Sequence, residues 1–471
     1  MKATAHDGGR VEIGTVMLDN LKLHLRGQVI IAGGTDYDEC RTVWNAMIDK
    51  KPSIVVRCLG TADVIECIRF AQEHGLLLSI KGGGHNIAGL AAIDDGMMLD
   101  MSLMRGVWVD SQGKVAHAQA GCLLGDVDSE TQLAGLAAVL GFNSATGLAG
   151  LTLGGGFGYL TRRWGWTSDN VVGMNIITAE GRLVRASDDE NEDLFWGLRG
   201  GGGNFGVVTS IDYLLYPVGP EIIGGIVAWP LSGAPGVFEL YRNLAGSAPP
   251  ELTLVIILRR APGVVWLPKE VHGKLIVAIL ACYSGNPEEG EKVVAPIKSF
   301  GKPVGDILKR RPYVEMQSLL DRTQPKGRRN YWKNEYLPGI EPALGGKLIN
   351  HAAKITSPHT SVILFQIEGA LNNIADDFSA TGNRNAHYIL NILGSWEKVE
   401  DDNLNIEWVR EAWNDMKPFS TGGNYINFQT EDEGSERMEA ALGRGLHKLV
   451  SIKTKWDPLN MFRSNRNIKP D

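Results

Sequence analysis

Three clusters of glycine, at residues 82–84, 154–158 and 200–206, constrain the fold of this chain more than any other feature of its sequence. The chain has 58 glycines among 471 residues, against a usual share of about 7% in globular proteins. The clusters lie between apolar segments and are not low-complexity filler. Glycines gathered in this way indicate turns with positive φ, or places where the backbone approaches another group closely.

The first cluster ends a strand–helix–strand pattern. Ser53–Cys58 is a short β-branched run and Leu76–Ile80 is an apolar one. Between them, Thr61 can cap a helix that Gly75 ends. The second run leads directly into Lys81–Asn86. We therefore expect a βαβ-like unit whose second strand opens into a glycine-rich loop.

Two of the clusters lie in loops suited to phosphate groups. Adjacent glycines leave several backbone N–H groups unshielded, and such a nest binds phosphate oxygens without a charged side chain. The loops are Lys81–Asn86 and Thr146–Gly158. A pair of ordinary turns is the alternative interpretation. Because two such loops are present, the sequence favours a site for both phosphates of a dinucleotide.

The third cluster satisfies the pattern G-x-G-x-x-G at residues 201–206. A helix is expected before it, over Asp193–Gly197, and a strand after it, over Val207–Tyr216. A Rossmann fingerprint needs the reverse order, with the phosphate at a helix N-terminus. We therefore expect no Rossmann NAD site. The sequence also lacks the P-loop, HExxH and GxSxG patterns.

The pattern of the sequence changes after about residue 217. Alternating segments there predict strands, and amphipathic segments between them predict helices. This interleaving is typical of an antiparallel sheet backed by helices, so we expect an α+β fold. The expected strands are 222–229, 252–260, 273–282 and 360–368, and the expected helices are 233–245, 286–299, 383–394 and 404–415. Two further helices are expected over 125–139 and from 436 onward.

Composition and charge exclude several classes of protein. A net charge of −7 argues against a nucleic-acid binder. No apolar run reaches the roughly 18–20 residues that cross a bilayer, and the first thirty residues show no secretory signal. The five cysteines have no metal-ligand spacing. We therefore expect reduced thiols, no metal site and a cytoplasmic location.

Six motifs follow one another along residues 50–471. They are Lys81–Gly89, Gly147–Gly158, Trp196–Thr209, Tyr331–Lys333, Tyr425–Phe428 and Lys453–Pro470. In this order they resemble the motifs of the berberine-bridge-enzyme-like FAD oxidases of bacterial type. These belong to the vanillyl-alcohol-oxidase, or PCMH-type, flavoprotein superfamily. Any one motif is weak by itself, and their order along the chain makes the joint signal strong.

The resemblance implies a fold, a cofactor and a set of cofactor-binding residues. It implies a PCMH-type FAD-binding domain over 1–217, a substrate domain over 218–420, and a segment over 421–471 that returns to the FAD domain. The implied FAD ligands are Lys81, Gly82, Gly83, Gly84, His85, Asn86, Gly89, Thr146, Gly147, Gly150, Leu151, Gly154, Gly155, Gly156, Gly158, Gly206, Val207, Tyr425 and Asn427.

His85 has a particular role in the resembling family, where the matching histidine bonds covalently to the flavin. A neutral imidazole nitrogen is a nucleophile, and the adjacent glycines allow its ring to approach the cofactor. A hydrogen-bonded structural histidine is the alternative. Many relatives add a second bond through a cysteine, but residues 141–146 contain none. We therefore expect a single covalent bond, through His85.

Tyr425 matches the catalytic base of several family members. Phenols titrate near pKa 10, so a basic role requires a nearby cation, and Lys333 is the candidate. Gln366 and Glu368 share one face of an expected strand. That face either lines the substrate cavity or meets solvent, and the sequence does not decide between them.

The implied reaction transfers hydride from a small alcohol, carbohydrate or secondary metabolite to flavin N5, and O₂ then reoxidises the flavin to give H₂O₂. Leu148 lies where a bulky side chain would slow reoxidation, which would favour a dehydrogenase with another acceptor. An oxidase acting on amines or alkaloids is a second alternative, and a flavin-binding protein without turnover is a third. The sequence specifies neither the substrate nor the oligomeric state.

Overall fold

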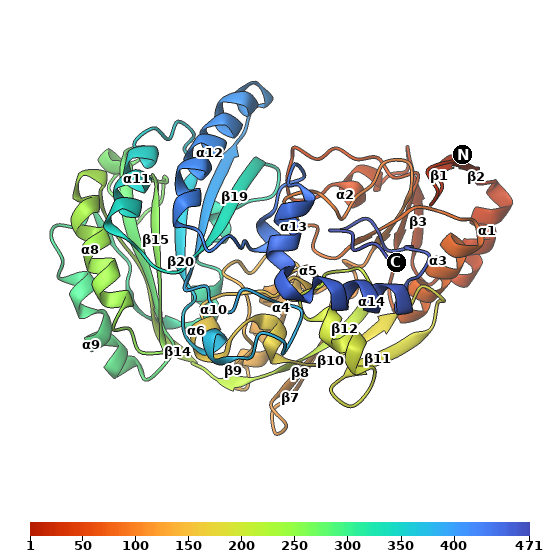
Figure 1. Cartoon of the computed structure of the whole chain (residues 1–471), viewed down its shortest axis with the longest axis horizontal. Helices are drawn as coiled ribbons and strands as arrows, with labels where there is room; N and C mark the ends of the chain where they lie inside the picture. Colours follow the sequence, from red (N-terminus) through yellow and green to blue (C-terminus); the bar gives the residue numbers. More distant parts are fainter.

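The structure is a computed structural model that describes all residues 1–471, and three sheets of four or more strands organise it (Figure 1). A four-stranded and a five-stranded sheet lie in one half of the molecule. An eight-stranded antiparallel sheet, with its own helices, forms the other half. Helices and antiparallel sheets are thus combined in one chain, and the expected α+β class is confirmed.

Residues 1–100 form the four-stranded sheet and its helices. Its strand order is β3-β4-β6-β5, and β4, β6 and β5 run parallel. The helix between β4 and β5 buries Val64 and Ile68 in the core and ends before Gly75, whose φ is +60°. The expected strand–helix–strand unit is confirmed. The elements are β1 (Lys2–Thr4), β2 (Arg10–Glu12), α1 (Thr15–His24), β3 (Gln28–Ile31), α2 (Tyr37–Arg41), β4 (Ile54–Arg57), α3 (Thr61–Glu73), β5 (Leu78–Lys81) and β6 (Met97–Asp100).

Residues 107–217 form the five-stranded antiparallel sheet, in the order β11-β10-β12-β8-β7. The third glycine cluster lies between a helix and a strand, as expected. The helix expected over 125–139 instead ends at Gln132, because Gly135 takes a φ of +65° and a short strand follows. The elements are β7 (Val107–Asp110), β8 (Val115–Gln119), α4 (Leu124–Gln132), β9 (Leu136–Ala137), α5 (Leu148–Leu153), α6 (Thr161–Trp164), β10 (Val171–Ile177), β11 (Leu183–Ser187), α7 (Glu192–Leu198), β12 (Val207–Leu214) and β13 (Tyr216–Pro217).

Residues 221–416 form the eight-stranded sheet, whose order is β17-β14-β16-β15-β20-β21-β19, with β18 also paired to β14. Helices cover one face, and the other face packs toward the first half of the chain. The elements are β14 (Glu221–Pro230), α8 (Ala234–Ala245), β15 (Leu252–Arg260), β16 (Leu275–Tyr283), α9 (Pro287–Lys298), β17 (Gly305–Asp306), β18 (Lys309–Pro312), α10 (Tyr313–Gln317), β19 (Arg329–Leu337), α11 (Pro342–Ala352), β20 (Ser361–Gln366), β21 (Tyr388–Trp396) and α12 (Asp402–Met416).

One expected helix of this half is wrong. Residues 383–394 lie largely in β21, which pairs with β20 and β19 inside the sheet. Every residue of β21 is buried, because helices cover one face of the sheet and the first half of the chain covers the other. A strand buried on both faces has a continuous apolar run, which periodicity cannot distinguish from a buried helix.

The last residues of the chain return to the first half. In Figure 1, α13 (Ser435–Leu442) and α14 (Leu446–Trp456) run from the middle of the molecule across the five-stranded sheet. The Lys453 Nζ donates hydrogen bonds to the backbone oxygens of Asn204, at 2.8 Å, and Phe462, at 2.9 Å. It also pairs with Asp457 at 2.7 Å, and both side chains are fully buried. This buried cation ties the third glycine cluster to the C-terminal segment.

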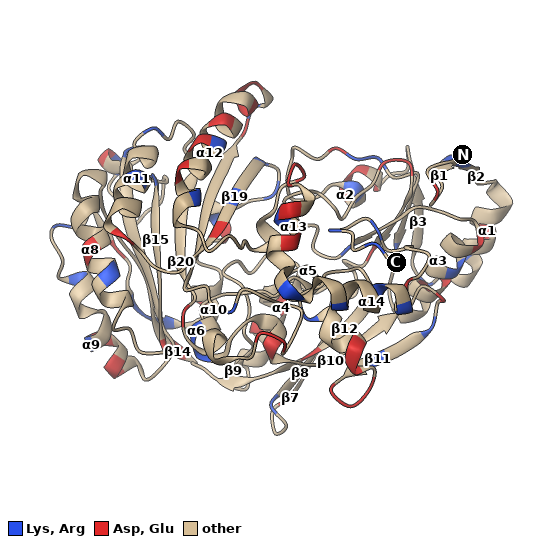
Figure 2. Cartoon of the chain, viewed as in Figure 1, with Lys and Arg blue, Asp and Glu red and all other residues tan.

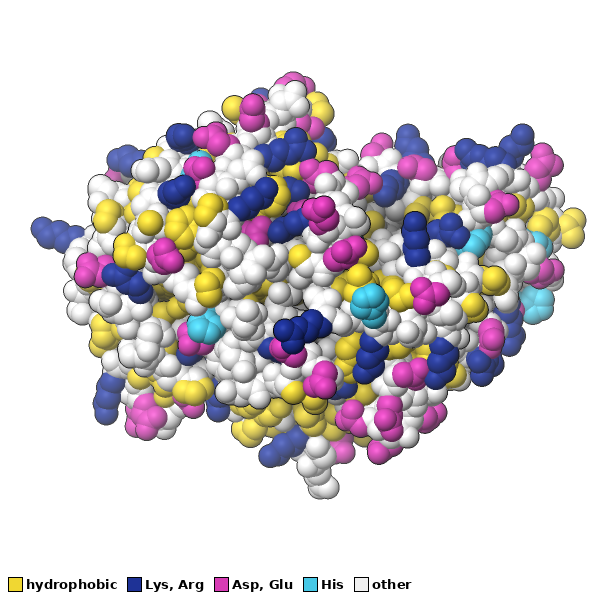
Figure 3. Space-filling model, in the orientation of Figure 1, with side chains coloured by type: hydrophobic (Ala, Val, Ile, Leu, Met, Phe, Trp, Pro, Cys, Tyr) yellow, Lys and Arg dark blue, Asp and Glu magenta, His cyan; other side chains and the backbone are white.

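Charged side chains of both signs are mixed over the surface. Figure 2 shows acidic and basic residues on helices of both halves, and they are interspersed on the face drawn in Figure 3. None of the helices combines the length and the hydrophobicity needed to cross a membrane. The five cysteines are buried and free, and no three His, Cys, Asp or Glu side chains are grouped as metal ligands.

The Lys453 pair makes a testable prediction. We expect Lys453→Met to cost about 3–5 kcal/mol of folding free energy, because it leaves the Asp457 carboxylate buried and uncompensated. Lys455→Met is the matched control in the same helix: its pair with Asp193, at 2.7 Å, is largely exposed and should change stability by less than about 1 kcal/mol. The thermal unfolding midpoint, followed by circular dichroism, measures both. Equal shifts for the two variants would contradict a special role for Lys453.

Candidate functional site

A cavity of about 360 Å³ lies between the three glycine clusters and the inner face of the eight-stranded sheet. The C-terminal segment closes it, through residues 425–428 and 462–466. Segments that are far apart in the sequence therefore meet around one space. No Asp, Glu or Lys side chain is among the lining residues, and the basic side chains there are His85 and Arg466.

Most of the residues that the sequence assigns to the cofactor line this cavity. They are Gly82, Gly83, Gly84, His85, Asn86, Thr146, Gly147, Gly150, Leu151, Gly154, Gly206, Val207, Tyr425 and Asn427. The others lie behind the lining and support it: Lys81, Gly89, Gly155, Gly156 and Gly158. The Lys81 ammonium, for example, is 3.5 Å from Asp100 and donates to the backbone oxygen of Cys40.

The first loop presents a row of unused backbone donors. The five consecutive N–H groups from Gly82 to Asn86 donate no hydrogen bond within the protein. Buried backbone N–H groups are nearly always paired, so such a row is suited to an anionic ligand. The residues present thus fit the pyrophosphate of the FAD that the sequence implies, without a charged side chain.

The second loop packs directly on the first. A Cβ added to Gly83 would lie 2.5 Å from the Cα of Gly147, so both positions require glycine. Just before the second loop, the Ser144 backbone N–H donates to Asp321 at 3.0 Å, which holds this segment from the other half of the chain. The position of Leu148 is a correction: its side chain is buried in the core. Ala149 and Gly150 line the cavity instead.

His85 lies in the cavity wall with its ring stacked on Trp44, with 4.4 Å between the ring centroids and 21° between the planes. Burial lowers the pKa of His85 to about 4, so the imidazole is neutral at physiological pH. Its Nε2 is enclosed and makes no hydrogen bond. A neutral, fixed imidazole with a free nitrogen is what a covalent bond to the cofactor requires. Trp44 lies outside every recognised motif, so its contact with His85 could not be predicted from the sequence.

Tyr425 is buried at the far end of the second loop. Its phenol oxygen accepts hydrogen bonds from the Gly156 backbone N–H, at 3.1 Å, and from the Asn427 amide, at 2.9 Å. Burial raises the pKa of Tyr425 to about 12, although these two donors act in the opposite direction. The phenol is therefore neutral at physiological pH, and it packs among aromatic rings, including Phe157 and Phe428.

Lys333 is not the cation that would activate Tyr425. Successive side chains of a strand point to opposite faces, so Trp332 and Asn334 face the inner side of β19 while Lys333 faces the helices. There the Lys333 ammonium pairs with Glu433 at 2.9 Å and Asp432 at 3.1 Å. It does not line the cavity.

Gln366 and Glu368 also lie away from the cavity. The Gln366 amide donates to the backbone oxygen of Ala245, on the helix-covered face of the sheet, at 3.0 Å. Glu368 follows the end of β20 and is half exposed. Their neighbours of opposite orientation, Ile363 and Phe365, line the cavity instead. The two histidines left open by the sequence, His351 and His387, do not line it either.

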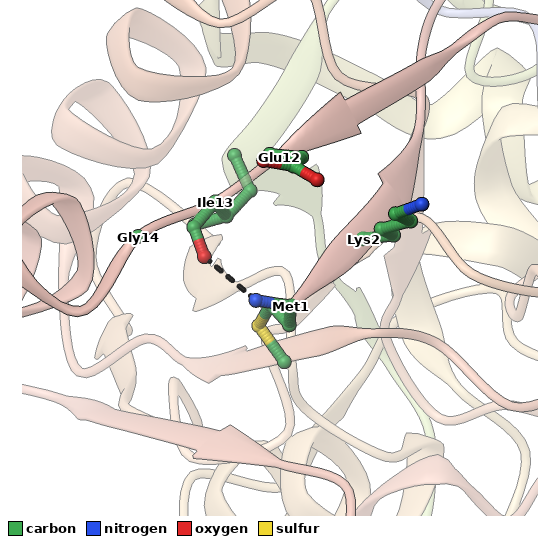
Figure 4. Close-up of a pocket in the computed structure, with 5 residues that line it drawn as sticks. All are labelled: Met1, Lys2, Glu12, Ile13 and Gly14. Atoms are coloured by element: carbon green, nitrogen blue, oxygen red, sulfur yellow. Dashed lines mark hydrogen bonds between the residues drawn. The ribbon is translucent and has the colours of Figure 1, made fainter.

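A second hollow, at the N-terminus, is lined by Met1, Lys2, Glu12, Ile13 and Gly14. Figure 4 shows the terminal amine of Met1 donating to the backbone oxygen of Ile13, at 2.9 Å. This bond extends the β1–β2 ribbon. Since the hollow brings no set of catalytic groups together, the candidate site is the cavity at the glycine loops.

Comparison with known proteins identifies the family. The "FAD binding domain" model matches residues 52–187, and the "Berberine and berberine like" model matches residues 424–469. An FAD-linked oxidoreductase of Dictyostelium discoideum is 31% identical over 95% of both chains. The (R)-6-hydroxynicotine oxidase of Paenarthrobacter nicotinovorans is 29% identical over 95% of this chain and 98% of the relative. The tetrahydroberberine oxidase of Berberis wilsoniae is 26% identical over 89% and 86%.

A solved structure agrees with these matches. The crystal structure of 6-hydroxy-D-nicotine oxidase from Arthrobacter nicotinovorans superposes with a TM-score of 0.84 and 26% identity, covering 98% of this chain and 100% of that one. FAD is therefore the cofactor of this chain, and the resemblance seen in the sequence is confirmed. The chain belongs to the berberine-bridge-enzyme-like family of FAD-linked oxidoreductases.

Proposed function

We propose that the protein is an oxidase that removes a hydride from a C–H bond next to nitrogen in a small, uncharged aromatic amine. The observation that carries this proposal is the combination of a neutral Tyr425 with a cavity that offers no carboxylate and no lysine. An alcohol needs a base to take its hydroxyl proton, and the cavity holds none that is active at neutral pH. A neutral amine supplies its own lone pair.

The residues that line the cavity support a division of roles between the two halves. We assign cofactor binding to residues 1–217 together with 421–471, and substrate binding to the sheet face within 218–420. Bound FAD would supply the two-electron acceptor, with O₂ as the final oxidant. The N–H groups of the first loop hold the pyrophosphate, and the sheet face excludes water from the reacting C–H bond.

The reaction balances without a protein base. The substrate C–H bond breaks with loss of a hydride, and the nitrogen lone pair forms the C=N bond of an iminium ion. The hydride equivalent, one O₂ and one proton together give H₂O₂. Tyr425 keeps its proton: its oxygen accepts two hydrogen bonds, and its O–H donates none within the protein, so it can donate one to the substrate.

Two observations favour an amine substrate and O₂. Relatives over most of the chain are named for the oxidation of 6-hydroxynicotine and of tetrahydroberberine, and both are nitrogen heterocycles. The bulky Leu148 lies in the core, and small residues, Ala149 and Gly150, line the cavity at that loop. The expected obstacle to O₂ is thus absent from the lining, which favours an oxidase over a dehydrogenase.

We expect H₂O₂ formation and matching O₂ consumption with small secondary and tertiary aromatic amines, measured with an oxygen electrode. The kcat/KM should rise with pH as the amine loses its proton, and then level off. Tyr425→Phe should lower kcat by no more than about tenfold. If Tyr425 were the base, the rate would keep rising toward pH 12 and the Phe variant would lose about 10²–10⁴-fold. That outcome would favour an alcohol substrate and would overturn the amine proposal.

We also propose that the FAD is attached covalently, through His85 alone. After acid precipitation, the wild-type pellet should be yellow and the protein mass should include that of FAD. His85→Ala should give a colourless pellet with the flavin in the supernatant. His117→Ala, a partly exposed histidine paired with Asp212, is the control and should stay yellow. Free flavin from the wild-type protein would show that the cofactor is not covalently bound.

A further inference from the structure

Two polar side chains on the inner sheet face have no hydrogen-bond partner in the protein. The Trp332 indole Nε1 and the Asn391 Oδ1 are enclosed and unpaired, and both residues line the cavity. Trp332 is 7% exposed and Asn391 is 1% exposed. Their lining neighbours on this face are apolar: Ile363, Phe365 and Leu393. Both unpaired groups therefore border the same space.

Asn334 shows that the amide of an asparagine on this face can find its hydrogen-bond partners within the protein. It lies directly opposite Asn391 in the sheet. Its Oδ1 accepts from the Tyr425 backbone N–H at 2.6 Å, and its Nδ2 donates to the Tyr425 backbone oxygen at 3.3 Å. The Asn391 amide has no such bond through either atom. A buried polar group without a partner costs free energy, so it marks a position where a ligand supplies the partner.

The two groups are close enough for one small molecule. Trp332 pairs with Leu393, and Asn391 pairs with Asn334, so Trp332 and Asn391 are diagonal neighbours on adjacent strands. The Cα atoms of such neighbours lie about 7–8 Å apart. The Trp332 ring is held edge-on against Trp44 at 5.7 Å and Phe428 at 5.3 Å. The direction of its N–H is therefore fixed.

We propose that Trp332 and Asn391 determine substrate specificity by binding one polar edge of a heteroaromatic ring. The indole N–H donates a hydrogen bond to an acceptor on the ring. The carboxamide forms hydrogen bonds with an adjacent donor and acceptor, as asparagine does with a nucleobase edge. The ligand class is a neutral lactam, or a ring nitrogen with a neighbouring amino or hydroxyl group. No carboxylate lines the cavity, so a cationic group has no counter-charge there.

This inference rests on the proposed function only for the statement that the bound ring belongs to the substrate. Binding of a ring analogue tests the inference without turnover. The probes are 2-pyridone, which has a lactam N–H beside its carbonyl, and N-methyl-2-pyridone, which keeps the carbonyl alone. Each is titrated into the oxidised holoenzyme, by calorimetry and by the change in the flavin spectrum. We expect 2-pyridone to bind roughly tenfold more tightly, because its N–H pairs with Asn391.

Two variants give different signatures. Asn391→Leu should weaken 2-pyridone binding roughly tenfold and bring the ratio of the two affinities to about one. Trp332→Phe keeps an aromatic ring and removes the N–H. It should therefore weaken the binding of both probes by a similar factor and preserve the ratio of their affinities. Bound FAD per chain and the thermal midpoint confirm that each variant is folded. Phe365→Leu changes the shape of the lining but adds and removes no polar atom. It is the control and should preserve the ratio of the two affinities.

Three results would overturn the proposal: no binding of 2-pyridone to the wild type up to its solubility limit, equal affinity for both probes, or an unchanged ratio in Asn391→Leu. An altered flavin spectrum in Asn391→Leu with an unchanged ratio would assign Asn391 to the cofactor instead. Failure of the proposed oxidase function is seen separately. In that case the probes discriminate as expected, while amines consume no O₂.

Discussion

The contact between Gly83 and Gly147 is the constraint on which the cofactor site depends. It joins two loops from different parts of the first half, backbone against backbone, with no room for a Cβ at either position. The contact leaves the N–H groups of Gly82–Asn86 unpaired and places them along the cavity. The same loop places His85 against Trp44, where burial keeps the imidazole neutral.

The alternation of side chains in the eight-stranded sheet decides which of its side chains face the cavity. Trp332 and Asn391 face the cavity, whereas Lys333 and Gln366 face the helices. A shift of one residue in any of these strands would exchange the two sets. The actual register keeps the Lys333 ammonium on the helix side of the sheet, away from Tyr425. That arrangement is the basis for proposing a neutral substrate whose own lone pair assists the loss of hydride.

The C-terminal segment completes the site from a distance in sequence. Tyr425 and Asn427 reach the second loop, and the buried Lys453 holds the backbone of the third cluster. Because the chain must return before the cavity closes, cofactor binding and the packing of α14 are linked. A desolvated ammonium with a carboxylate and two carbonyl oxygens as partners is stable only when all of them are in place.

The sequence by itself determined the glycine loops, the α+β class, the family and its FAD cofactor, and most of the residues that it assigns to the cofactor line the cavity. These follow from local patterns, since a glycine cluster after a strand has few other uses and six motifs in order identify a family. The expected helix over 383–394 failed because β21 is buried on both faces and has no alternation to reveal it. Only the tertiary structure decided that Lys333, Gln366 and Glu368 lie outside the cavity, that Asn391 lines it and that Trp44 stacks on His85. Which face of a strand meets the cavity depends on register and on partners far away in the chain, and a single sequence carries no local record of either.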